Sequence, residues 1–267
     1  MPVTMPASSP VRGLRALGLW AEGTLGRRFG WEAALARANR PVMELSDMQP
    51  VTAAWWRERR LVPGELLYLA LGDSTAQGIG ASTPGRSYVG QLLDRIEARA
   101  GAPVRAWNLA VSGATSALCV RDQLRRAEKP LRRNPDLVTL AIGANDIAEW
   151  NPVAFHSNLN RVLDALPPHT IVGEVPCFFL PPREGLVQEA NGILRTIAAA
   201  RGLAVAPVHR ATRERGLRGV LTEFAADAFH PNDRGYQVWT DAFWPLVEAR
   251  VEAVLGRAGA PAQRRSA

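Results

Sequence analysis

The sequence predicts an α/β protein of three layers, in which a five-stranded parallel sheet lies between two layers of helices. Short apolar runs alternate with longer amphipathic stretches from residue 66 to residue 255. The first run, residues 66–71, leads directly into Gly72-Asp73-Ser74, which is typical of a buried strand that ends in a tight turn. Since right-handed crossovers place the carboxyl ends of parallel strands at one edge, the loops after the strands are expected to meet there.

The expected elements follow from this alternation. The expected strands are residues 66–71, 104–110, 137–142, 170–175 and 203–208, and the expected helices are residues 87–100, 115–128, 153–165, 186–201 and 234–255. A helix between successive strands allows parallel pairing and covers both faces of the sheet.

The chain is expected to have three parts: a helical basic arm (residues 1–62), a main domain (residues 63–255) and a loose basic tail (residues 256–267). The net charge of +7 is concentrated in the arm and the tail, which carry nine and three arginines against five and no acidic residues. One interpretation of the arm is a weak contact with an anionic membrane surface or a partner. The other, which its tryptophans favour, is that it packs on the main domain.

Composition narrows the class of protein. The 20 basic and 20 acidic residues of positions 63–255 cancel, so the main domain has no charge bias that suggests nucleic acid as a partner. No apolar stretch is long enough to cross a membrane, and the N-terminus lacks a clear secretory signal, which leads us to expect a cytoplasmic protein. Cys119 and Cys177 are expected to be buried free thiols. Neither a metal site nor a cofactor is expected, because no ligand spacing or phosphate-binding glycine motif is present.

Four segments carry polar residues where the predicted strands end or the last helix begins. They are Gly72-Asp73-Ser74, the small-residue turn around Gly113, Gly143-Ala144-Asn145-Asp146, and Asp227-Ala228-Phe229-His230-Pro231. In this order and at these separations they resemble the sequence blocks of the SGNH (GDSL-type) hydrolases. The resemblance covers about residues 66–250. One difference is Thr75, which stands at the position of the leucine in the Gly-Asp-Ser-Leu motif that gives the family its name.

The resemblance implies a flavodoxin-like SGNH fold for the main domain and a serine esterase or lipase that needs no cofactor. A serine hydroxyl becomes a good nucleophile when a base removes its proton. His230 has an acid three residues earlier, Asp227, which suits it to be the base that acts on Ser74. The resemblance assigns the oxyanion hole to the N–H groups of Ser74 and Gly113 and to the side-chain amide of Asn145.

The substrate is expected to be a small-molecule or lipid acyl ester. Phe178 and Phe179, in a proline-rich loop after the fourth strand, are candidates to line an acyl pocket together with Trp150, although these rings equally suit packing of the loop. The alternative to an enzyme is a non-catalytic binding protein on the same fold, or one whose arm serves a membrane or protein contact.

Overall fold

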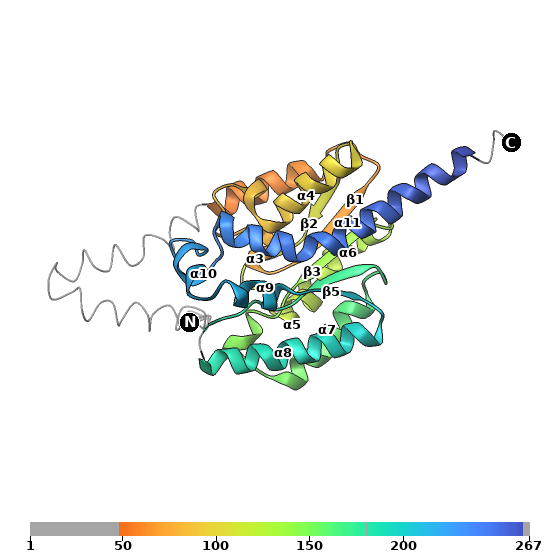
Figure 1. Cartoon of the computed structure of the whole chain (residues 1–267). Coiled ribbons are helices and arrows are strands. Elements are labelled where there is room, and N and C mark those ends of the chain that lie inside the picture. The colour runs from red at the N-terminus through yellow and green to blue at the C-terminus, as the bar shows by residue number, and fades with distance from the viewer. Residues whose placement is uncertain (1–47, 180, 264–267) are drawn as a thin grey trace, which may run out of the picture. The chain divides into compact units, whose positions relative to one another are not determined.

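The computed structural model describes residues 48–179 and 181–263, with side chains as far as Arg257 (Figure 1). The expectations for residues 1–47 lie outside the described residues. The chain divides into two compact units, Met1–Met48 and Gln49–Ala267, and the second contains the whole sheet. No helix within the described ranges is long and apolar enough to cross a membrane.

Five parallel strands form a single sheet in the order β2-β1-β3-β4-β5, which confirms the predicted fold class. The strands are β1 (Leu67–Gly72), β2 (Arg105–Asn108), β3 (Leu137–Ala141), β4 (Thr170–Gly173) and β5 (Ala204–Ala206). Each strand starts within one residue of the start of its predicted run. Most of the strands end one or two residues early, because the pairing stops where the loops bend away. The order places the end of β1 between the ends of β2 and β3, at the point where the direction of winding reverses.

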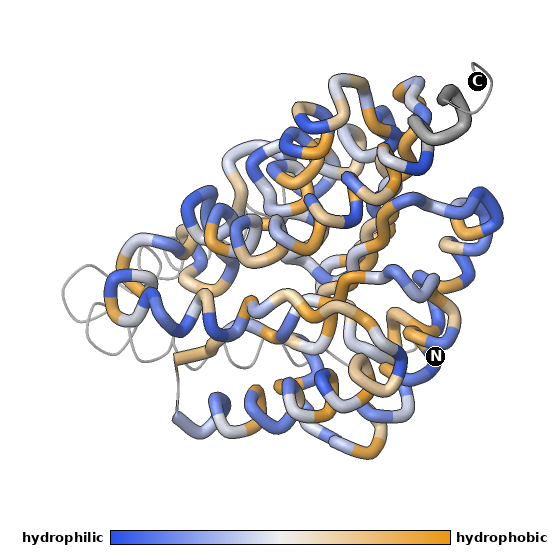
Figure 2. Tube along the Cα trace, turned by 45° about the vertical axis from the view of Figure 1, so that its right-hand side comes forward, coloured by the Kyte–Doolittle hydropathy of each residue, from blue (hydrophilic) through white to orange (hydrophobic). Residues whose placement is uncertain are grey.

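Both faces of the sheet are buried, and β1 shows how its side chains alternate between them. Tyr68 and Ala70 belong to one hydrophobic core, whereas Leu69 and Leu71 belong to the other. In Figure 2 the apolar residues accordingly follow the strands through the middle of the molecule. This continuous apolar character is what a parallel sheet covered on both sides requires.

Helices from both ends of the domain cover the first face. They are α4 (Tyr88–Ala100), α9 (Val208–Glu214) and α11 (Asp233–Gln263), with α3 (Ser74–Gln77), η1 (Pro84–Arg86) and α10 (Gly216–Thr222) nearby (Figure 1). Between α4 and α11, the rings of Tyr88 and Phe243 stack with centroids 5.3 Å apart. This packing joins an early and a late segment of the chain in the first core.

The second face is covered by the helices between β2 and β5. They are α5 (Ser116–Leu118), η2 (Cys119–Gln123), α6 (Leu124–Leu131), η3 (Asp146–Glu149), α7 (Pro152–Asp164) and α8 (Pro181–Ala200). The predicted helix 115–128 is thus interrupted by a wider turn at η2, which contains the buried Gln123. The sequence also predicted a later start for α8 and did not predict α9 and α10, which are short and lack strong apolar periodicity.

At the C-terminus, α11 continues to Gln263, whereas a loose tail was expected from residue 256. The helix continues here although Gly256, Gly259 and Pro261 each weaken a helix, which is why the sequence predicted that it ends at residue 255. The boundary between the main domain and the tail is therefore not marked by the end of this helix.

The last part of the predicted arm lies against the main domain. Residues 48–59 are helical, and Trp56 is buried with its indole N–H donating to the carbonyl of Gln77 at 3.0 Å. Arg59 pairs with Glu97 of α4 at 2.5 Å. For this stretch, packing on the domain is the interpretation that the contacts support. Cys119 and Cys177 are free and buried, as expected.

Candidate active site

Ser74 lies at the carboxyl end of β1, as the first residue of α3. The turn before it needs Gly72, whose φ of 152° is unusual for other residues and whose added Cβ would lie 2.3 Å from the carbonyl oxygen of Ala141. The Asp73 carboxylate then accepts hydrogen bonds from the Thr75 N–H at 2.9 Å and the Thr75 hydroxyl at 2.7 Å, which caps α3. The backbone of Ser74 is thereby fixed on both sides.

His230 connects Ser74 to Asp227. Its Nε2 lies 2.9 Å from the Ser74 Oγ, and its Nδ1 lies 2.6 Å from Oδ2 of Asp227. The second oxygen of Asp227 accepts the N–H groups of Phe229 and His230, both at 3.0 Å. The three residues predicted to work together therefore form one chain of hydrogen bonds, although Ser74 and His230 are 156 residues apart.

The environment of Asp227 favours its charged form. Burial by itself raises the pKa of this carboxyl, but the hydrogen bonds and charge of His230, together with the two backbone N–H groups, outweigh it and leave the pKa below its ordinary value. Asp227 is therefore ionised at neutral pH and accepts a hydrogen bond from Nδ1 of His230. This selects the tautomer in which Nε2 has a free lone pair toward Ser74.

The loop that carries His230 is held by its surroundings. Gly80 lies so close that an added Cβ would be 2.4 Å from the Pro231 carbonyl oxygen and 2.8 Å from the His230 Cβ. Asn232 donates from its side-chain amide to the carbonyls of Thr222 and Phe224, both at 2.9 Å. Its side-chain oxygen accepts from the N–H groups of Arg234 and Gly235 at 2.9 and 3.1 Å, which caps α11.

Gly113 and Asn145 follow β2 and β3, the two strands that flank β1. Gly113 has a φ of 75°, and an added Cβ would meet nothing within 4 Å, so the backbone angle rather than crowding requires glycine here. The Asn145 side-chain amide donates to the Ala114 carbonyl at 2.9 Å. An amide NH₂ has two hydrogens, so this bond orients the side chain and leaves one hydrogen for another acceptor.

Asp146 joins these two loops. Its carboxylate accepts the Ser116 N–H at 2.9 Å and the Ser116 hydroxyl at 2.5 Å. Ser116 lies three residues after Gly113 and is fully buried. The loops after β2 and β3 are therefore tied together through this one carboxylate.

The three predicted substrate-binding residues are partly buried at the same edge. Trp150 packs on Phe155 with ring centroids 5.2 Å apart and donates its indole N–H to Glu189 at 2.8 Å. The Phe178 N–H donates to Glu184, and its side chain packs against the second core. Phe179 has a φ of 58°, a strained angle for this residue type. Their contact with a substrate stays a prediction.

Two groups of residues were missed from the sequence. Gln123 clamps the catalytic turn, because its side chain accepts from the Gly72 N–H at 3.0 Å and donates to the Gly72 carbonyl at 2.7 Å. A glutamine within a helical stretch gave no signal for this. The second group is Cys177, Glu184 and His209, which are separated in the chain but close together in the structure. The sequence predicted only that Cys177 is a buried thiol.

Comparisons with known proteins identify the family of the chain. The model of the GDSL-like lipase/acylhydrolase family matches residues 70–238, more than half of the chain. The GDSL-like esterase Rv1075c of Mycobacterium tuberculosis is 27% identical over 216 residues, which are 73% of this chain and 66% of that protein. The chain thus spans just under two thirds of the length of this relative.

Solved structures share the fold. A lipase/acylhydrolase from Enterococcus faecalis has a TM-score of 0.57 at 22% identity and covers 72% of this chain and 96% of its own. An acetylxylan esterase from Geobacillus stearothermophilus has a TM-score of 0.54 at 21% identity and covers 70% of this chain and 95% of its own. Together with the family match, this shows that the chain belongs to the GDSL-like lipase/acylhydrolase family, a family of ester-hydrolysing enzymes.

Proposed function

We propose that the protein is a serine esterase that cleaves carboxylic esters through an acyl-enzyme and needs no cofactor. The observation that carries this proposal is the hydrogen-bonded chain from Asp227 through His230 to Ser74, at the edge of the sheet where α/β proteins bind their ligands. Membership of a lipase/acylhydrolase family supports the same reaction.

In the first half of the reaction, Nε2 of His230 takes the proton of the Ser74 hydroxyl as Oγ attacks the ester carbonyl. Asp227 holds the imidazole in place and stabilises the imidazolium that forms. His230 then gives the proton to the departing alcohol, and the acyl group stays on Ser74. In the second half, His230 activates a water molecule that attacks the acyl-enzyme, which releases the acid and restores the serine.

The oxyanion formed in each half needs donors that are already in place. We assign this role to the N–H groups of Ser74 and Gly113 and to the remaining amide hydrogen of Asn145. Support comes from the order of the sheet, because the loops after β2 and β3 flank the end of β1. The bond from Asn145 to Ala114 also ties the side-chain donor directly to the Gly113 loop.

The proposed substrates are small-molecule or lipid acyl esters. Relatives with this fold include, by name, a lipase and an acetylxylan esterase, so the fold accommodates both lipid and carbohydrate esters. We propose that Phe178 and Phe179, which follow β4, line the acyl side of the site, with Trp150 nearby. Phe178→Ala and Phe179→Ala should then each change the ratio of octanoate to acetate ester hydrolysis by about tenfold, the worth of a few buried methylene contacts. An unchanged ratio in both variants would refute this assignment.

A non-catalytic binding protein on the same fold is the competing proposal, and covalent labelling separates the two. A fluorophosphonate ester reacts with a serine only when a base activates it. We expect wild type to gain one probe adduct on the peptide that contains Ser74, and Ser74→Ala to gain none. His230→Ala should react far more slowly. An unlabelled, folded wild-type protein, or an adduct on a different serine, would contradict the proposed function.

A further inference from the structure

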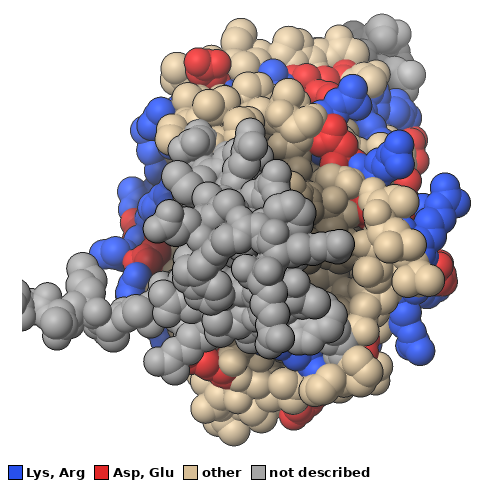
Figure 3. Space-filling view, turned by 90° about the vertical axis from the view of Figure 1, so that its left-hand side faces the viewer, with Lys and Arg blue, Asp and Glu red and all other residues tan. Residues whose placement is uncertain are grey.

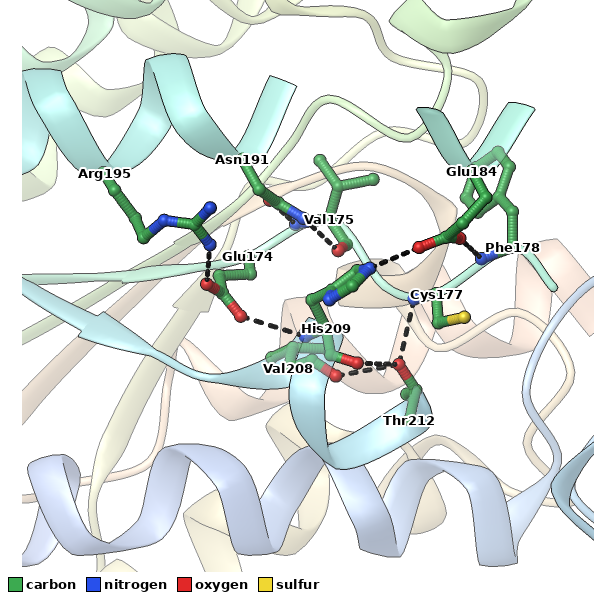
Figure 4. Close-up of polar contacts among 10 residues, drawn as sticks. All are labelled: Glu174, Val175, Cys177, Phe178, Glu184, Asn191, Arg195, Val208, His209 and Thr212. Carbon is green, nitrogen blue, oxygen red and sulfur yellow. Dashed lines mark hydrogen bonds and ion pairs between the residues drawn. The ribbon is translucent and has the colours of Figure 1, made fainter. Parts of the chain in front are cut away.

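Three chemically different side chains converge beside the ends of β4 and β5, where Figure 4 shows them together. Cys177 lies in the loop after β4, Glu184 in the first turn of α8, and His209 in the first turn of α9. One sulfur, oxygen or nitrogen atom from each lies within 4.8 Å of the others. Cys177 is buried, and the side chains of Glu184 and His209 are only 17% and 12% exposed.

The side-chain atoms that could bind a metal face one another, and hydrogen bonds to neighbouring groups hold the residues that carry them. His209 Nε2 lies 2.6 Å from Oε1 of Glu184, while Oε2 of Glu184 accepts the Phe178 N–H at 2.9 Å. One carboxylate oxygen is therefore held by the backbone, and the other is directed at the cluster. At metal sites a ligating carboxylate is commonly oriented in this way, by a hydrogen bond to the oxygen that does not bind the metal.

The backbone around the cluster is also fixed. The Cys177 N–H donates to the Thr212 hydroxyl at 2.9 Å, and the His209 N–H donates to Glu174 at 3.2 Å. Asn191 of α8 bonds both the N–H and the carbonyl of Val175, at 2.8 and 2.9 Å. Figure 4 shows this network tying the β4 loop, α8 and α9 together. Little reorganisation would therefore be needed before a ligand binds.

A thiolate, an imidazole and a carboxylate are together the donors that zinc prefers, whereas calcium and magnesium take oxygen donors alone. We propose that Cys177, Glu184 and His209 bind a Zn²⁺ ion, with water as the fourth ligand. As the Zn–S bond forms, the thiol of Cys177 loses its proton to solvent. In a tetrahedral site with bonds of about 2.0–2.3 Å the ligand atoms are roughly 3.3–3.7 Å apart, so side-chain shifts of about 1 Å complete the geometry.

Without the ion, the same residues form a hydrogen-bonded cluster. Burial raises the pKa of Cys177 and keeps it a neutral thiol. Burial also acts to raise the pKa of Glu184, but hydrogen bonds from His209, the Phe178 amide and Cys177 outweigh it, so that carboxyl is ionised.

The ion would hold the loop between β4 and α8 against α9. Because this loop carries Phe178 and Phe179, the site would stabilise one wall of the proposed acyl pocket rather than take part in the reaction at Ser74. The inference about zinc does not rest on the esterase proposal, since binding is measured without substrate.

Cobalt spectroscopy tests the proposal directly, because Co²⁺ replaces zinc and absorbs light strongly when a thiolate is bound. The chain has two cysteines, so Cys177 is the only thiol in a Cys119→Ser variant. We expect untagged, metal-free Cys119→Ser to develop a thiolate-to-cobalt charge-transfer band and tetrahedral visible bands that saturate at one equivalent, and equimolar Zn²⁺ to abolish both. Absence of the charge-transfer band in the folded protein would overturn the proposal.

Ligand variants then test the other two donors. Glu184→Gln and His209→Asn should bind zinc about 100-fold more weakly or worse in competition with a chromophoric chelator, since even changes around a metal site cost 10–100-fold. His169→Asn is the matched control, because His169 contacts the carbonyl of Pro135 instead. Zinc affinity that is unchanged in Glu184→Gln and His209→Asn, or reduced equally in the control, would contradict the assignment. Far-UV circular dichroism shows that each variant is folded.

Discussion

Removal of the Asp146 carboxylate should weaken both the fold and the proposed reaction, because this side chain joins the loops of Gly113 and Asn145. In Asp146→Ala, the fully buried Ser116 loses the acceptor of its N–H at 2.9 Å and of its hydroxyl at 2.5 Å. Asn158 donates to the Ser116 Oγ at 3.3 Å, but this contact does not accept the hydroxyl hydrogen. Both donors of Ser116 therefore lose the acceptor that Asp146 provides.

The structure sets the size of the effect. Each buried donor left without a partner costs about 1–3 kcal/mol. Against this, burial raises the pKa of Asp146, so the wild-type protein already bears a cost for holding that charge, and the variant recovers part of it. We therefore expect the free energy of unfolding to fall by about 2–4 kcal/mol.

The kinetic effect should appear in kcat. Loss of one oxyanion donor typically costs on the order of 10²–10³ in rate. Displacement of the Gly113 and Asn145 donors is a partial loss, so we expect kcat for an acetate ester to fall about 10–100-fold while KM changes little. Asp146→Asn keeps an oxygen that can accept the Ser116 N–H and should recover much of both losses.

The assays are urea unfolding followed by tryptophan fluorescence, and steady-state kinetics at a temperature where every variant is folded. Asp122→Ala is the control, since Asp122 pairs with exposed arginines and such pairs contribute little. A variant Asp146→Ala with wild-type kcat would refute the positioning role, and one with wild-type stability would refute the hydrogen-bond argument.

Two further predictions concern stability. The pKa of Asp227 lies below its ordinary value in the folded protein, so its charge stabilises the fold above about pH 4, and that contribution is lost as pH falls through the lower folded value. The difference in unfolding free energy between wild type and Asp227→Asn should therefore be constant from pH 5 to 7 and shrink below pH 4 in urea titrations; a difference that grows on acidification would contradict the sign. Gln123→Leu leaves the Gly72 N–H without its partner, whereas the Gly72 carbonyl keeps the Val111 amide at 3.2 Å, so denaturation should show a loss of about 1–3 kcal/mol. Unchanged stability would mean that the clamp on the catalytic turn is dispensable.

The fold was predictable because its signals are local. The apolar run ending in Gly72-Asp73-Ser74 marks a buried strand and its turn, and the alternation of strands with helices permits parallel pairing. The limits of the elements were less predictable. The residues Gly256, Gly259 and Pro261 indicated an end near residue 255 that α11 does not have. The wide turn of η2 depends on Gln123 reaching the backbone of a distant strand.

In the candidate site, too, some residues could be predicted from the sequence and others could not. Asp227 and His230 are close in sequence, so their pairing could be inferred from spacing, and the resemblance supplied Ser74, Gly113 and Asn145. By contrast, the meeting of Cys177, Glu184 and His209 depends on how the β4 loop, α8 and α9 are packed. Figure 3 shows basic and acidic side chains interspersed around the visible part of one face.

The most direct test of the proposed function is the hydrolysis of p-nitrophenyl acetate and octanoate by wild type and Ser74→Ala, measured side by side. We predict turnover of at least one ester by wild type and a loss on the order of 10⁴–10⁶-fold in the variant, because removal of a nucleophile leaves only the contribution of the remaining site. Circular dichroism should show that both proteins are folded. Equal turnover by the two proteins would contradict the assignment of Ser74 as the nucleophile.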